Sequence, residues 1–107
     1  MKPRPRYADD RPYVVAESLA DLAGPRHGVI ELPTALDWSP HGIYDVDVDD
    51  DARLLYETVL REAIELDDLH LFLNGELLVS LWPRLWLPRR LGQAWQSRFP
   101  RALRSAA

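Results

Sequence analysis

Residues 49–63 read DDDARLLYETVLREA and carry the strongest helical periodicity in the chain. Apolar side chains at positions 52, 55, 56, 59, 60 and 63 recur on one face of a helix, which predicts a buried stripe. Arg53, Glu57 and Arg61 follow one another at i,i+4 outside that stripe. The aspartates at 49–51 stand where the free amides and the dipole of a helix start favour negative charge. The segment therefore predicts an amphipathic helix over residues 52–63.

Two short stretches before this helix are typical of strands. Residues 29–32 (VIEL) are rich in apolar side chains and lie between Gly28 and Pro33, which suits a short strand. In residues 43–48 (IYDVDV), apolar and acidic side chains alternate, the period of a strand with one buried face. Before both, SLADLAG at 18–24 predicts a short helix that Ser18 caps and Gly24 ends.

The chain after the central helix is also helical in pattern. Residues 67–81 keep helical spacing, and Asn74-Gly75 within them is a break or turn signal. One interrupted helix and two short helices both fit that pattern. Pro88 opens a last helix over 88–98, because proline is tolerated in the first turn. The expected fold is α+β, a mostly helical small single domain with a short two-stranded β element.

The length of 107 residues is enough for one domain. Three prolines among charges at the start predict a mobile N-terminal arm over 1–13, followed by a globular domain over 14–100 and a frayed tail over 101–107. The expected core residues come from the three longer helices: Leu55, Tyr56, Val59, Leu60, Leu69, Phe72, Leu73, Leu91, Trp95 and Phe99.

Several kinds of chemistry are absent from the sequence. There is no cysteine, which removes disulfides and thiolate chemistry. The aspartates of 45–51 fail the spacing of a calcium loop, because Asp50 falls where that loop requires glycine. The histidines form no metal pair, and no glycine-rich phosphate loop occurs. We therefore expect neither an enzyme nor a metal, cofactor or small-molecule substrate. No apolar run suits a membrane span, so the expected location is cytoplasmic.

The charge of the chain is unevenly distributed. The net charge is −4, yet residues 1–50 hold five basic and ten acidic side chains, and residues 77–107 hold six arginines and no acid. Such polarity is informative about partners. Asp45, Asp47, Asp49 and Asp50 form the first candidate contact surface, suited to a basic protein partner.

The second candidate surface is the segment LWPRLWLPRRLGQAWQSRF at 81–99. Trp95 shares a helix face with Leu91 and Phe99, so it is expected in the core. Trp82 and Trp86 flank Pro83 in an irregular link, where a large ring either fills a gap or anchors a partner. As an alternative, tryptophan stacking together with phosphate contacts favours nucleic-acid binding. The arginines of that alternative are Arg84, Arg89, Arg90 and Arg98.

Five stretches of residues 18–100 carry a family resemblance: LADLAGPRHGVIELP, LDWSP, YDVDVDDDARLLYETVLREA, DDLHLFLNGELLVSLWPRLWLP and AWQSRFP. Together they resemble a group of small actinobacterial proteins, some labelled transcriptional regulators, that are associated with genes for nucleotidyltransferase-type (AbiEii-like) toxins. The resemblance implies an antitoxin by analogy and supplies no catalytic residue.

Taken with that resemblance, the residues predict a non-enzymatic protein-binding module, an antitoxin that neutralises a nucleotidyltransferase-like toxin by direct contact. Such a toxin binds nucleotide and RNA, so an acidic segment such as Asp45 to Asp51 is expected to cover its basic site. The alternative is a small DNA- or RNA-binding transcriptional regulator that uses the Arg/Trp-rich C-terminal third.

Overall fold

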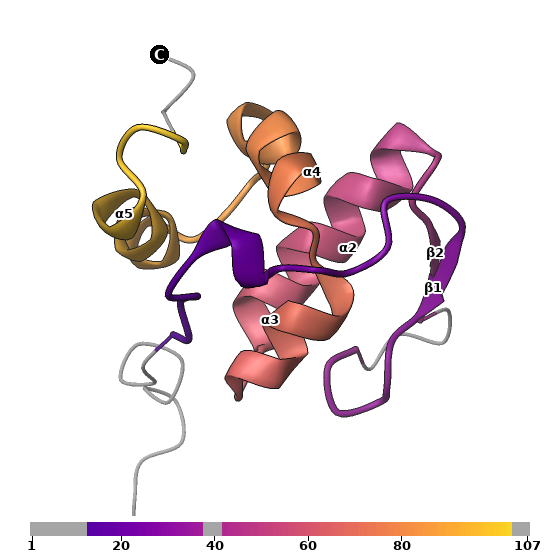
Figure 1. The fold of residues 1–107 in the computed structure, drawn as a ribbon. Coiled ribbons are helices and arrows are strands. Elements are labelled where there is room, and N and C mark those ends of the chain that lie inside the picture. The colour runs from indigo at the N-terminus through magenta and orange to yellow at the C-terminus, as the bar shows by residue number, and fades with distance from the viewer. Residues whose placement is uncertain (1–12, 38–41, 104–107) are drawn as a thin grey trace, which may run out of the picture.

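A computed structural model describes residues 13–37 and 42–103. The described chain is a mostly helical α+β domain, as predicted (Figure 1). Its elements in order are the 3-10 helix η1 (Leu19–Asp21), strands β1 (Val29–Glu31) and β2 (Ile43–Asp45), helices α2 (Asp49–Glu62), α3 (Leu66–Phe72) and α4 (Gly75–Leu81), the 3-10 helix η2 (Trp82–Arg84) and helix α5 (Arg89–Arg98). Within the described residues, no helix is long and apolar enough to cross a membrane.

Helix α2 lies between the small sheet and α5 (Figure 1). Its predicted apolar stripe is buried, with Leu55, Tyr56, Val59 and Leu60 inaccessible to solvent or nearly so. The helix begins at Asp49, three residues before the predicted start. The aspartates therefore form its first turn, where the free amide groups of the helix start stabilise their negative charge.

Strands β1 and β2 pair in antiparallel register, with Ile30 opposite Tyr44. Ile30 is buried, whereas Val29 and Ile43 are exposed on the other face. The prediction that the second strand reaches residue 48 was wrong, because the chain turns at Asp45. The Asp45 side chain accepts a hydrogen bond from Asp47 N at 2.9 Å, and its carbonyl accepts one from Val48 N at 3.0 Å. This turn leads directly into α2.

The Asn74-Gly75 signal marks a break between two helices, which settles the alternative left open by the sequence. The Asn74 side chain caps α4 by accepting hydrogen bonds from Glu76 N at 3.1 Å and Leu77 N at 3.2 Å. The N-terminal segment lies against this break, since Gly24 N donates to Leu73 O at 2.8 Å and Gly75 N donates to Leu22 O at 3.0 Å. These two hydrogen bonds thus hold the segment after η1 against the start of α4.

Most of the predicted core is buried. Eight of the ten side chains named from the sequence belong to the buried core: Leu55, Tyr56, Val59, Leu60, Leu69, Leu73, Leu91 and Trp95. Phe72 and Phe99 are partly buried and pack against that core. Leu78 and Leu81 of α4 are also buried in the core, and the sequence had not singled them out.

The two chain ends differ from their predicted boundaries. Leu103 is 1% exposed and donates its amide to Phe99 O at 2.9 Å, so this residue of the predicted tail belongs to the core. Tyr13, assigned to the mobile arm, packs against the core. The rest of that arm and residues 104–107 lie outside the described residues.

Candidate functional site

The acidic residues predicted as a contact surface are largely engaged within the protein. Asp47 Oδ1 lies 2.8 Å from His27 Nδ1, and Asp47 Oδ2 accepts a hydrogen bond from Gly28 N at 3.1 Å. The bond with His27, and then that with Gly28, lowers the pKa of Asp47 below its ordinary value. Asp47 therefore closes the end of the β1–β2 pair, where Gly28 has a positive φ of 91°.

The neighbouring aspartates divide into internal and solvent-facing groups. Asp45 is half-buried, and its amide donates to Asp51 Oδ2 at 3.0 Å. Asp49 forms a close ion pair with Arg84. Asp50 is strongly exposed and lies 3.8 Å from Arg53 Nη2. Of the four predicted contact residues, Asp50 presents its carboxylate most fully to solvent.

Residues 84–88 (RLWLP), which we call the strap, connect η2 to α5 and run along α2. Arg84 holds one end of the strap to Asp49 in the first turn of α2. Two turns further along that helix, Glu57 Oε2 accepts a hydrogen bond from the Trp86 amide at 2.7 Å. Glu57 is only 8% exposed, so this bond is shielded from water. Glu57, which the sequence placed outside the apolar stripe of α2, thus holds the strap.

Within the strap, the Trp86 ring points into solvent and is 88% exposed. Beside it is a hollow of about 380 Å³ lined by Arg61, Trp86, Leu87 and Pro88. Trp82, predicted together with Trp86 as a partner anchor, is 6% exposed and belongs to the core. Of the two alternatives for this ring, Trp82 fills a gap, because it is enclosed where α4 passes into η2.

The four arginines of the nucleic-acid alternative do not share one environment. Arg84 is paired with Asp49, and Arg98 Nη1 donates to the Ala16 carbonyl at 3.2 Å. Arg89 and Arg90 are exposed in the first turn of α5, directly after the strap. Arg84 and Arg98 thus hold other parts of the chain in place, whereas Arg89 and Arg90 lie on the exposed start of α5.

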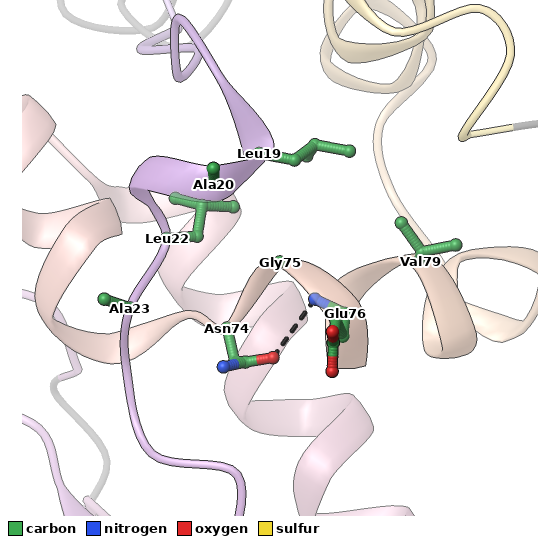
Figure 2. Close-up of a pocket in the computed structure, with 8 residues that line it drawn as sticks. All are labelled: Leu19, Ala20, Leu22, Ala23, Asn74, Gly75, Glu76 and Val79. Carbon is green, nitrogen blue, oxygen red and sulfur yellow. Dashed lines mark hydrogen bonds between the residues drawn. The ribbon is translucent and has the colours of Figure 1, made fainter.

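A second hollow, of about 560 Å³, lies between η1 and α4 and was not foreseen from the sequence. Its lining is mainly apolar, with a single carboxylate, as Figure 2 shows: Leu19, Ala20, Leu22, Ala23, Asn74, Gly75, Glu76 and Val79. The only sequence signal for it was the pair of glycines, Gly24 and Gly75, which permit close backbone approach. We call this hollow the η1–α4 groove.

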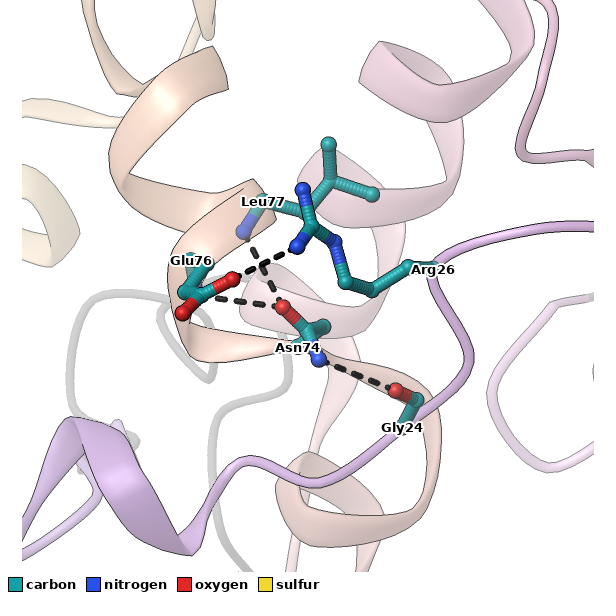
Figure 3. A network of polar contacts seen from close by, with 5 residues as sticks. All are labelled: Gly24, Arg26, Asn74, Glu76 and Leu77. Atoms are coloured by element: carbon teal, nitrogen blue, oxygen red, sulfur yellow. Dashed lines mark hydrogen bonds and ion pairs between the residues drawn. The ribbon is translucent and has the colours of Figure 1, made fainter.

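Polar contacts fix the wall of this groove (Figure 3). Asn74 Nδ2 donates to Gly24 O at 3.2 Å, while Asn74 Oδ1 caps α4. Arg26 Nη1 pairs with Glu76 Oε1 at 2.6 Å. Both partners of that ion pair are more than half exposed, so it adds little to stability. The asparagine, in contrast, ties the N-terminal segment to the start of α4.

Comparisons of the chain with family models, curated proteins and solved structures found no match. Among the residues that the structure describes, no three His, Cys, Asp or Glu side chains are grouped so as to hold a metal ion.

Proposed function

We propose that this protein is a non-enzymatic protein-binding module and that Trp86 in the strap is its contact residue. In keeping with the family resemblance, the proposed role is that of an antitoxin that neutralises a nucleotidyltransferase-like toxin by direct contact. The observation that carries the proposal is the 88% exposure of the Trp86 side chain on a backbone bonded to the buried Glu57. Tryptophan is enriched among residues that dominate binding energy at protein interfaces.

The fixed backbone favours this use of the ring. The Trp86 amide is hydrogen-bonded to Glu57 at 2.7 Å, and Arg84, two residues before Trp86, is paired with Asp49. A tryptophan side chain has only two rotatable bonds, and here its backbone is already ordered. Binding through Trp86 therefore loses less conformational entropy than binding through a free loop would.

The internal contacts of the aspartates change which surface we propose for the partner. Asp47 and Asp49 are engaged with His27 and Arg84, so fewer free carboxylates face a partner than the sequence implied. The proposed contact accordingly centres on Trp86 and the adjoining hollow, and Asp50 is the most exposed carboxylate left for a basic partner. Electrostatic attraction by the acidic run becomes secondary in this proposal.

The test is calorimetric titration of this protein into the nucleotidyltransferase-type toxin that the proposal assigns to a neighbouring gene. Trp86→Ala should weaken binding by at least ~30-fold, the equivalent of ~2 kcal/mol for a dominant interface residue. Leu71→Ala, which truncates another strongly exposed apolar side chain, is the matched control and should leave affinity unchanged. If Trp86→Ala leaves the affinity unchanged and Asp50→Asn weakens binding, the contact surface is the acidic run and not Trp86.

Nucleic-acid binding is the second candidate, supported by the position of Arg89 and Arg90 just after Trp86. A base stacking on the indole with phosphates near these guanidinium groups is the expected mode. A single-stranded oligonucleotide should then quench tryptophan fluorescence, and Arg89→Gln with Arg90→Gln should reduce the salt slope by roughly one for each phosphate that is no longer neutralised. Salt-dependent quenching that Trp86→Ala abolishes would favour this candidate over the first.

A further inference from the structure

The protein carries an exposed apolar knob and an apolar groove on different elements. The knob is the Trp86 ring of the strap, which is 88% exposed. The groove is the η1–α4 groove, an open hollow of about 560 Å³. Both surfaces are wet in the isolated chain, and burial of an indole against aliphatic walls is favourable.

The rims of the two features have opposite charge. Glu17 and Asp21 are exposed around η1, and Glu76 stands on the α4 wall, where Arg26 offsets one of these charges. Around the knob, Arg61 lines the hollow beside Trp86, and Arg89 and Arg90 follow the strap.

Two acids lie near the knob, and one of them offsets the charge of Arg61, so the exposed basic charge beside the ring is that of Arg89 at the start of α5. Glu57 is buried beneath the Trp86 amide, and Glu62 lies 3.9 Å from Arg61 Nε. A segment that suits the η1–α4 groove is therefore an aromatic residue flanked by arginines, and this chain contains one in LWLPRR at 85–90.

We propose that the η1–α4 groove binds the Trp86 knob of a second copy of this chain. A buried aromatic side chain removes ~150–250 Å² from water, well below the ~1,200–2,000 Å² of a standard stable interface. Self-association is therefore weak, reversible and dependent on this one ring. The inference goes beyond the proposed function, and it makes a second copy and a toxin compete for Trp86.

Sedimentation equilibrium of the purified 107-residue chain tests the proposal without any toxin. The average mass should rise above the 12.3 kDa of one chain as concentration increases. The rise should be smaller at high salt, because salt screens the attraction between the two rims. A mass of one chain at every concentration up to the order of 1 mM would overturn the proposal.

Two complementary variants make the test specific. Trp86→Ala removes the knob but keeps the groove, whereas Ala20→Phe fills the groove from an exposed position of η1 and keeps the knob. Each variant alone should be monomeric, and an equimolar mixture should form a complex of one copy of each. Circular dichroism verifies that both variants fold.

The control is Val29→Ala, which truncates an exposed side chain of β1 and should associate like the unaltered chain. Persistent self-association of Trp86→Ala, or a mixture that stays monomeric, would show that knob and groove do not meet. Because the toxin is absent from every sample, these outcomes are independent of the proposed antitoxin role.

Discussion

Tyr56 is buried in α2, and its hydroxyl oxygen accepts a hydrogen bond from Asn74 N at 2.8 Å. The phenol thus supports the residue at which α3 gives way to α4. Burial raises the pKa of Tyr56 from 10.0 to about 12, although the bond from Asn74 opposes that rise. The side chain therefore stays neutral at pH values where an exposed tyrosine ionises.

This pKa predicts a decrease of stability in alkali. Because the folded state holds the Tyr56 proton more tightly, its contribution is complete below pH 10 and is lost as pH rises towards about 12. The decrease from this group should approach roughly 2–3 kcal/mol. Denaturant unfolding from pH 9 to 12 measures it, and the Tyr56→Phe protein should have a smaller decrease. Equal slopes in the two proteins would contradict the assignment.

The lowered pKa of Asp47 predicts that its contribution to stability is lost in acid, the opposite of Tyr56. Its pKa is lowered in the folded state, mainly by the hydrogen bond with His27, so its contribution is present above the ordinary value of 3.8 and is lost as pH falls further. Carboxyl NMR titration should find Asp47 ionising below an ordinary aspartate. In His27→Ala the pKa should rise, yet the Gly28 amide should still keep it below 3.8. An unchanged titration would show that His27 does not act on Asp47.

At the scale of elements, the contact of η1 with α4 depends on the absence of a side chain at Gly75. A Cβ atom there would overlap the Leu19 carbonyl oxygen, and one at Gly24 would lie 2.7 Å from the Phe72 carbonyl carbon. Both obstacles are main-chain atoms, which cannot move aside as a flexible side chain does. The close approach of these two segments is therefore fixed by glycine.

Gly75→Ala should destabilise the protein by ~1–3 kcal/mol, because η1 must move away from α4. Gly92→Ala is the matched control, since a Cβ at this position of α5 meets nothing within 4 Å. That change should be neutral or stabilising by up to ~1 kcal/mol through helix propensity. Thermal unfolding compares the two variants, and a stabilised Gly75→Ala protein would contradict the close contact.

At the scale of the whole molecule, the two tryptophans on either side of the start of α5 have opposite roles. Trp95 is fully buried, with its ring centroid 6.0 Å from that of Phe99, and it attaches α5 to the core. Trp86, nine residues earlier, contributes almost no buried surface.

Trp95→Ala should therefore cost ~3–5 kcal/mol of unfolding free energy. Trp86→Ala should cost no more than ~0.5 kcal/mol, as expected for an exposed side chain. Chemical denaturation of the two variants distinguishes them directly. Equal destabilisation would mean that the strap, and not only α5, is part of the cooperative core.

The sequence by itself determined the elements whose periodicity is local. The stripe of α2 and the face of α5 that holds Leu91 and Trp95 were predictable, because helical geometry alone places residues three and four apart on one side. The break at Asn74-Gly75 was also marked by its own residues, and only the choice between one helix and two remained open.

Only the tertiary structure decided the fate of residues whose partners are distant in sequence. Trp82 and Trp86 each follow a leucine, yet one is buried and the other exposed, since the path of the strap is set by Glu57 twenty-nine residues away from Trp86. In the sequence Asp49 has no evident partner, and only the structure places Arg84, thirty-five residues later, beside it. Spacing along the chain carries no record of such contacts, because they form only when packed helices bring the two segments together.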